Sequence, residues 1–179
     1  VKGGEAQARL IMERFPNGAT IVNVQGQPGA SPAIDRNRGL HNILDGNSKY
    51  KIVAEQTANW SRDQGMTVTE NILTGLSSAP EVINAANDDM ALGAMEAVKA
   101  RGIDVKILGF DALPEAIAAV RDGSLMATVE QFPGGQSKTA LNLLVNDLRS
   151  EMKAYNRVIS LNPITITSDN YQSNAERIG

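Results

Sequence analysis

"VKILGFDALPEA", residues 105–116, is the stretch from which the fold of this chain is predicted. The run from Val105 to Gly109 is apolar and typical of a buried strand, and helix-forming residues follow from Pro114. A large aromatic side chain and a carboxylate, Phe110 and Asp111, stand between the two. A strand that leads directly into a helix is the repeating unit of α/β proteins, so the rest of the chain should repeat it.

The alternation does continue along the chain. Apolar, β-branched segments predict strands at 19–25, 50–56, 81–86, 105–110 and 126–131. Helical patterns lie between them, at 31–45, 62–76, 88–101 and 113–122, and the first residues also look helical. Strands that alternate with helices favour right-handed crossovers and parallel pairing. The predicted fold class is therefore α/β, with an open, mostly parallel sheet and helices on both faces.

Composition excludes several classes of function. A chain of 179 residues with 42% hydrophobic residues is long enough for one globular domain with a good core. Its net charge of −3, without a basic block, argues against nucleic acid as a partner. Zero cysteines and one histidine exclude disulfides, thiolate metal sites and pairs of histidine ligands. Phosphate-loop, dinucleotide and nucleophile-elbow motifs are also missing, so we expect no enzyme activity, no cofactor and no metal site.

The candidate site follows from the fold class. In open parallel sheets, ligands bind beyond the carboxyl ends of the strands. The residues just past the predicted strands are Arg36, Trp60, Asn87, Phe110, Asp111 and Gln131. Aromatic rings pack on the C–H faces of a sugar ring, while carboxylate, guanidinium and amide groups exchange hydrogen bonds with its hydroxyls. This set therefore predicts recognition of a polyhydroxylated ring, with a ring face from Phe110 and a hydroxyl acceptor from Asp111.

Four of these residues also have a structural interpretation. Asn87, or the neighbouring Asp88, would serve as the cap of the helix that starts there. Asp111 would serve as a turn former before a proline, and Trp60 and Phe110 would be core residues. The binding interpretation is favoured because all six positions fall at the same end of successive strands.

Three stretches resemble a known family: "GASPAIDRNRGL" (29–40), "ANDDMALGAMEAV" (86–98) and "ILGFDALPEAIAAVRDGSLMATVEQFP" (107–133). They are similar to the periplasmic monosaccharide-binding proteins of ABC importers, the ribose-binding and related type. The resemblance covers nearly the whole chain, and all six candidate positions match sugar contacts of that family. It departs at Trp60, where the ribose binders have phenylalanine, so the identity of the sugar stays open.

The resemblance implies a two-lobed protein that closes on its sugar, with three hinge crossings between the lobes. Residues 1–132 would form the carboxyl-terminal sugar-binding lobe, 133–162 a helical segment of an amino-terminal lobe that this sequence lacks, and 163–179 the return crossing and tail. The implied partners are a monosaccharide, the membrane permease of an importer and the missing lobe. The implied location is the periplasm, or the cell exterior with a membrane anchor.

Two other functions share this kind of fold and stay open. One is the effector-binding core of a lactose-repressor type regulator, which would carry a DNA-binding motif upstream. The other is the sugar-sensing module of a receptor. The complete set of sugar-contact positions and the "QFP" at 131–133 favour the importer protein.

The helix expected at about 133–150 has an apolar stripe. The stripe consists of Leu141, Leu144, Val145, Leu148 and Met152, at helical spacing. Large apolar side chains left in water forgo roughly 1.5–3 kcal/mol each. The helix is therefore expected to meet an amino-terminal segment, to pack against a second copy, or to fold back on its own lobe.

Overall fold

Helices and strands alternate through the computed structural model, which describes residues 1–150 and 159–175. The strands are β1 (Ala19–Gln25), β2 (Tyr50–Thr57), β3 (Val82–Ala85), β4 (Lys106–Leu108), β5 (Thr128–Glu130) and β6 (Ile164–Ile166). The helices are α1 (Lys2–Arg14), α2 (Ser31–Leu44), α3 (Arg62–Gly75), α4 (Asp88–Arg101), α5 (Pro114–Asp122), α6 (Pro133–Ser150) and α7 (Tyr171–Asn174). The predicted strands and helices between residues 19 and 131 are confirmed, with ends that differ by at most two residues.

The sheet is mostly parallel. Four strands pair in the order β2-β1-β3-β4, all in parallel. A single parallel bridge between Leu108 and Ala127 joins β4 to the segment that leads into β5, and β5 pairs with β6 in antiparallel orientation. This arrangement confirms the predicted α/β class.

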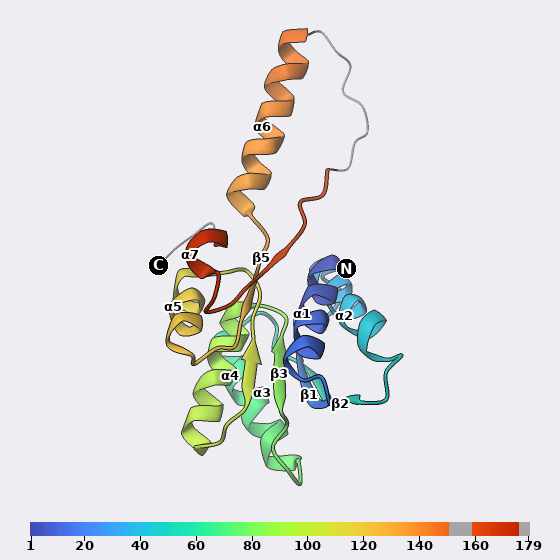
Figure 1. The fold of residues 1–179 in the computed structure, drawn as a ribbon, viewed down its shortest axis with the longest axis vertical. Helices are drawn as coiled ribbons and strands as arrows, with labels where there is room; N and C mark the ends of the chain where they lie inside the picture. The colour runs from blue at the N-terminus through green and yellow to red at the C-terminus, as the bar shows by residue number, and fades with distance from the viewer. Residues whose placement is uncertain (151–158, 176–179) are drawn as a thin grey trace.

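Alternating strand residues build two cores, one on each face of the sheet. Ile21 and Val82 pack with residues of α1 and α2, whereas Val22 and Ile83 pack with residues of α3, α4 and α5. Figure 1 shows α1 and α2 on one side of the strands and α3, α4 and α5 on the other. Because helices cover both faces, β1 and β3 are buried almost throughout, and the edge at the carboxyl ends of the strands is left for polar groups.

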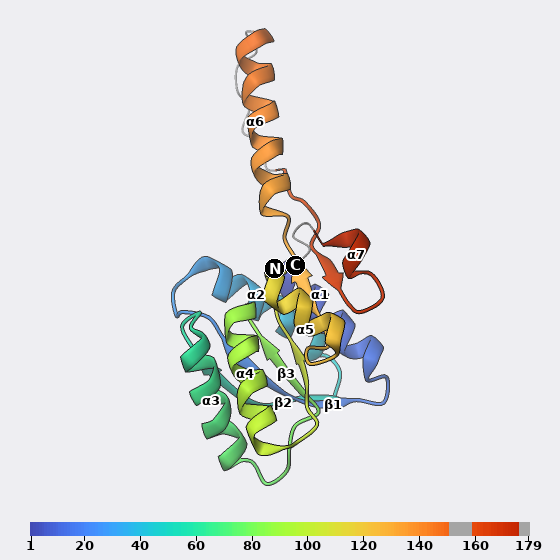
Figure 2. The ribbon, with the colours of Figure 1, turned by 90° about the vertical axis from the view of Figure 1, so that its left-hand side faces the viewer.

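The helix pairs on each face approach closely at glycines. A Cβ atom on Gly4 of α1 would lie 1.9 Å from the carbonyl oxygen of Arg36 in α2. On the other face, a Cβ on Gly93 of α4 would lie 2.0 Å from the carbonyl oxygen of Arg62 in α3, and Figure 2 shows α3 and α4 side by side. The contact at Gly4 sets the position of the α2 backbone at Arg36, one of the candidate site residues.

Helix α6 projects away from the body of the molecule in both views (Figures 1 and 2). Its leucines are exposed to solvent: Leu141 is 60% exposed, Leu144 55% and Leu148 74%. The expected alternative in which the helix folds back on its own lobe is therefore wrong, and Met152 lies outside the described residues. Within residues 1–150 and 159–175, none of the helices is both long and apolar enough to cross a lipid bilayer.

Candidate functional site

The six predicted site residues lie at the carboxyl edge of the sheet, as their positions in the elements show. Their positions are α2 for Arg36, the β2–α3 connection for Trp60, the start of α4 for Asn87, the β4–α5 connection for Phe110 and Asp111, and the end of β5 for Gln131. The structure brings Arg36, Phe110, Asp111 and Gln131 into contact. Trp60 and Asn87 lie next to them.

Arg36 is at the centre of this cluster. Its Nη2 atom lies 3.4 Å from Oδ1 of Asp111, and its Nη1 donates a hydrogen bond to the carbonyl oxygen of Ala86. Its guanidinium carbon lies 3.6 Å from the centroid of the Phe110 ring and 5.6 Å from that of Trp60, both within cation–π range. Burial lowers the pKa of Arg36 and the Asp111 carboxylate opposes that shift, so the side chain stays charged.

Asp111 is a hydrogen-bond acceptor of the cluster, and its backbone has an unusual conformation. Nε2 of Gln131 donates to Oδ1 of Asp111 at 2.6 Å. The φ angle of Asp111 is 115° and that of Trp60 is 65°, values that residues other than glycine seldom adopt. Such conformations persist where the surroundings enforce them, and they concentrate at ligand-binding sites. The backbone at Asp111 therefore supports a binding role over that of an ordinary turn former, and the backbone at Trp60 supports a binding role over that of an ordinary core residue.

The two aromatic rings each rest on a glycine. A Cβ on Gly3 would lie 2.4 Å from Cε2 of Phe110, and a Cβ on Gly26 would lie 2.1 Å from Cη2 of Trp60. Trp60 is partly exposed, whereas Phe110 is only 4% exposed and carries the Arg36 guanidinium on its ring. The core interpretation of Phe110 is thus supported, and its contact with a sugar stays a prediction.

Asn87 is the N-cap of α4, as its structural interpretation requires. Its Oδ1 accepts a hydrogen bond from the backbone N–H of Met90 at 3.0 Å. Its Nδ2 lies 3.5 Å from the carbonyl oxygen of Trp60, so the same amide also joins α4 to the Trp60 segment. Capping is therefore confirmed, and the contact between Asn87 and a ligand stays a prediction.

Sequence reasoning missed several buried polar residues behind the site. Gln7 is 1% exposed, and its Nε2 donates to the carbonyl oxygens of Ala85 and Gly109, at the ends of β3 and β4. The signal for Gln7 was a polar residue on the apolar face of an expected helix. Asp88 and Thr128 are fully buried beside the Asp111 segment. Nothing local distinguishes Asp88 from Asp89, because both follow the cap residue.

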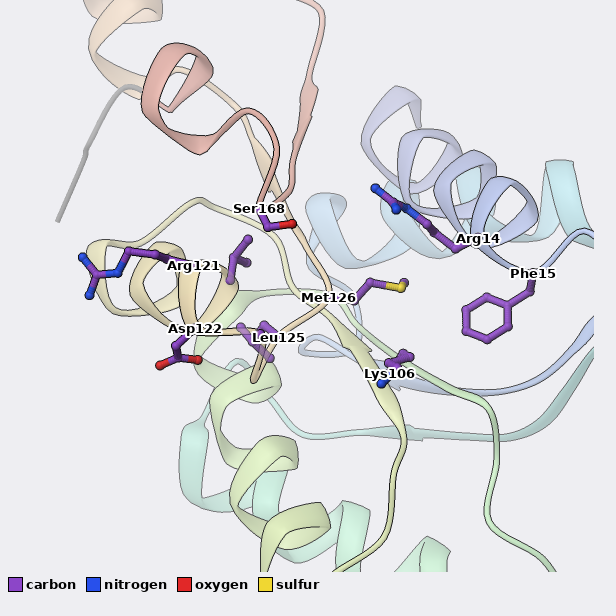
Figure 3. A pocket seen from close by; sticks show the side chains of 10 residues that line it. Arg14, Phe15, Lys106, Arg121, Asp122, Leu125, Met126 and Ser168 are labelled. Carbon is purple, nitrogen blue, oxygen red and sulfur yellow. The ribbon is translucent and has the colours of Figure 1, made fainter.

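Two hollows differ in their relation to the site. One of about 320 Å³ is lined by Phe110 and Gln131 together with Gly3 and Leu161, so it opens on the candidate site. The other, of about 510 Å³, is lined by Phe15, Lys106 and other residues near the amino ends of β4 and β5 (Figure 3). That second hollow is at the wrong end of a parallel sheet for the predicted ligand. Among residues 1–150 and 159–175, no three histidine, aspartate or glutamate side chains gather as metal ligands.

Comparisons with known proteins identify relatives of this chain. The periplasmic binding protein domain model matches residues 1–152. The ribose import binding protein of Bacillus subtilis is 43% identical over 133 residues, which are 74% of this chain and 43% of that protein. The fructose import binding protein of Bifidobacterium longum is 38% identical over 140 residues, 76% of this chain and 42% of that protein.

Solved structures agree with these matches. The myo-inositol binding protein of Caulobacter, solved with myo-inositol bound, is 47% identical with a TM-score of 0.90, and the match covers 99% of this chain and 61% of that one. The arabinose-transporter binding protein of Shewanella sp. ANA-3, bound to L-arabinofuranose, is 28% identical with a TM-score of 0.86. That match covers 98% of this chain and 59% of the other. The chain thus spans less than half of these curated relatives and about three fifths of these structures.

Proposed function

The chain belongs to the periplasmic binding protein domain family, and on that premise we propose that it is the ligand-binding lobe of a solute-binding protein for a neutral cyclic polyol, a monosaccharide or a cyclitol. The observation that carries the proposal is the cluster of Arg36, Asp111 and Gln131 under partly exposed Trp60, at the carboxyl edge of the sheet. The sugar-binding and myo-inositol-binding relatives support the same ligand class.

The charge balance of the cluster supports a neutral ligand. The Arg36 cation and the Asp111 anion pair with each other, so an approaching molecule meets both signs at one place. Hydroxyl groups donate to the carboxylate and accept from the guanidinium, whereas a charged ligand would have to displace one partner. Hydrogen bonds to such charged groups contribute about 1.5–3 kcal/mol each, which is enough for a small ligand with several hydroxyls.

We further propose that the protein captures its ligand without chemical conversion and delivers it to the membrane permease of an ABC importer. The ribose and fructose import binding proteins among the relatives support this role. It places the protein outside the cytoplasmic membrane, in the periplasm or anchored at the cell exterior.

A second lobe would complete the site. We propose that α6 and the residues to about 162 belong to that amino-terminal lobe, with residues 1–132 as the carboxyl-terminal lobe and 163–179 as the return crossing. Two observations support this division. The chain covers 61% of the myo-inositol binding protein, and α6 presents exposed leucines that need an apolar neighbour.

The proposal is tested by titration of the two-lobed protein with myo-inositol, D-ribose, D-allose and L-arabinose. Calorimetry should detect saturable binding of at least one of them. The fluorescence of Trp60, the single tryptophan of this chain, should change with it once tryptophans of the other lobe have been replaced. D-Glucuronate, which carries a charge, is the matched control and should bind more weakly. The proposal would be contradicted if none of the neutral probes produced either a heat signal or a change in fluorescence.

A further inference from the structure

The connection between β4 and α5 has an unusual backbone. Asp111 and the next residue, Ala112, have φ angles of 115° and 51°, two successive positions in a region that favours glycine. Each such residue costs on the order of 1–3 kcal/mol unless the surroundings compensate. Residues 110–113 therefore need strong external support, and this support decides where the Asp111 carboxylate lies.

Asp88 supplies contacts at both ends of this segment. Its backbone N–H donates to the carbonyl oxygen of Phe110 at 2.7 Å, and its Oδ2 accepts from the backbone N–H of Leu113 at 2.8 Å. One residue at the start of α4 thus holds the first and the last residue of the segment.

The middle of the segment is held through β5. The backbone N–H of Asp111 donates to the carbonyl oxygen of Val129, and that of Ala112 donates to Oγ1 of Thr128 at 3.1 Å. Oγ1 of Thr128 in turn donates to Oδ1 of Asp88 at 2.7 Å. The Asp88 carboxylate therefore orients the hydroxyl group that accepts the hydrogen bond from the backbone N–H of Ala112.

The Asp88 carboxylate is fully enclosed and lies close against the backbone at Gly109. Asp88 is 0% exposed, and a Cβ atom on Gly109 would lie 2.0 Å from its Oδ1. Burial raises the pKa of Asp88 to about 7, and the hydrogen bonds from Leu113 and Thr128 act in the opposite direction. A carboxyl group that stays buried despite this penalty indicates that its hydrogen bonds are needed at this place.

We propose that Asp88 is the positioning residue of the site, because it holds residues 110–113 in the strained conformation that directs Asp111 toward Arg36 and Gln131. The inference deepens the proposed function, since it relies on Asp111 as a ligand contact. Asp88 acts through the backbone of this segment and through Thr128, without a place in the contact surface itself.

Hydrogen exchange of the backbone amides in the ¹⁵N-labelled chain tests the positioning role without any ligand. Asp88→Ala should accelerate exchange at Asp111, Ala112 and Leu113 by at least tenfold, while the amides of β3 change less than twofold. Asp89→Ala is the matched control: it removes a carboxylate from the same first turn of α4, where the Asp89 side chain is 44% exposed and pairs with Arg62 rather than with residues 110–113, and it should leave all these rates unchanged. Equal acceleration in β3, or the same effect in both variants, would overturn the proposal.

A milder variant keeps the test decisive if Asp88→Ala fails to fold. Thr128→Val keeps the shape and removes the hydroxyl group, so it should accelerate exchange at Ala112 and spare β3. An unchanged Ala112 rate would count against the proposal.

Binding to the two-lobed protein forms the second arm of the experiment. With myo-inositol as the probe, Asp88→Ala should raise the Kd about tenfold and Asp89→Ala less than twofold. Equal Kd values for the wild type and Asp88→Ala would overturn the inference. Absence of binding by the wild type would instead count against the proposed ligand class, and the exchange rates would still decide the positioning role.

Discussion

The Arg36 guanidinium lies on the Phe110 ring and faces the Asp111 carboxylate, so one cation is held by an aromatic face and an anion together. Such a layered arrangement fixes the direction of its planar donors. A ligand hydroxyl that enters the site meets groups whose orientation is already set, and less conformational entropy is lost on binding.

At this scale, the proposed function predicts a large effect of Asp111→Ala on binding in the two-lobed protein. We expect sugar or cyclitol affinity to weaken by about 2–4 kcal/mol, because the variant removes a charged acceptor and leaves Arg36 and Gln131 without that partner. Calorimetric titration measures the change. The control is Asp104→Ala, an exposed carboxylate paired with Lys106 far from the site. A loss below about 0.5 kcal/mol for Asp111→Ala would leave this residue as a turn former.

Two residues predict how stability changes with pH. The folded chain holds the Asp88 proton more tightly than the unfolded chain, with a pKa of about 7 against 3.8, so stability falls as pH rises through this interval. For His41, burial lowers the pKa, but hydrogen bonds with Glu55 and Asp45 outweigh burial and raise it above 6.5. Its stabilising contribution is complete below that value and is lost as pH rises through the folded-state pKa.

Both contributions therefore lower the free energy of unfolding between pH 5 and pH 8, by a few kcal/mol as an order of magnitude. Urea unfolding at several pH values measures this slope. Asp88→Asn should flatten it, because the variant has no carboxyl group to titrate there, while Asp89→Asn should keep the wild-type slope. An Asp88→Asn curve parallel to that of the wild type would show that Asp88 ionises in the folded chain as it does in water.

At the scale of elements, the helix pairs are close because glycine stands at their crossing points. The structure leaves no room for a methyl group where α3 meets α4. A Cβ atom on Gly65 would lie 2.7 Å from Cα and O of Met90, which are backbone atoms. Gly75, at the end of the same helix, has open space around its Cβ position.

These two glycines form a matched pair for a packing prediction. Gly65→Ala should destabilise the chain by about 1–3 kcal/mol, because α3 must move away from α4. Gly75→Ala should be neutral or stabilise by up to about 1 kcal/mol, since alanine favours a helix. Thermal unfolding of both variants provides the measurement. Equal effects of the two substitutions would mean that α3 and α4 pack less closely than described.

At the scale of the whole molecule, α6 is the helix that projects from the body of the chain and exposes its leucines to solvent. Replacement of Leu141, Leu144 and Leu148 by serine should leave the unfolding temperature of the 179-residue chain unchanged and reduce any self-association seen by sedimentation velocity. In the two-lobed protein, the same replacement should cost several kcal/mol, because each buried leucine contributes roughly 1.5–3 kcal/mol.

Asn142→Ser, at an exposed polar position of the same helix, is the control. It should leave the stability of both the 179-residue chain and the two-lobed protein unchanged. A two-lobed protein that keeps its full stability after the triple replacement would contradict the assignment of α6 to the second lobe. A 179-residue chain that loses stability would contradict its exposed position in this structure.

The sequence by itself determined the fold class and the edge of the sheet at which the six candidate residues meet. Hydrophobic periodicity and turn residues are local properties, so the strands and helices from Ala19 to Gln131 were predicted with small errors at their ends. The carboxyl ends of parallel strands meet at one edge, and for this reason the sequence alone predicts that six residues far apart in the chain lie close together there. Their positions at that edge agree with the prediction, whereas their contacts with a ligand stay predictions.

Only the tertiary structure decided what individual side chains do there. Asp88 and Asp89 are equivalent in the sequence, yet Asp88 is buried against β5 and Asp89 is half-exposed beside Arg62, because the turn of α4 points one toward the sheet and the other toward α3 at the surface. Phe110 was expected to offer a ring face, and the approach of α2 placed Arg36 on that ring. Burial and charge pairing depend on groups that the chain brings together from distant segments, and local pattern carries no information about their final distances.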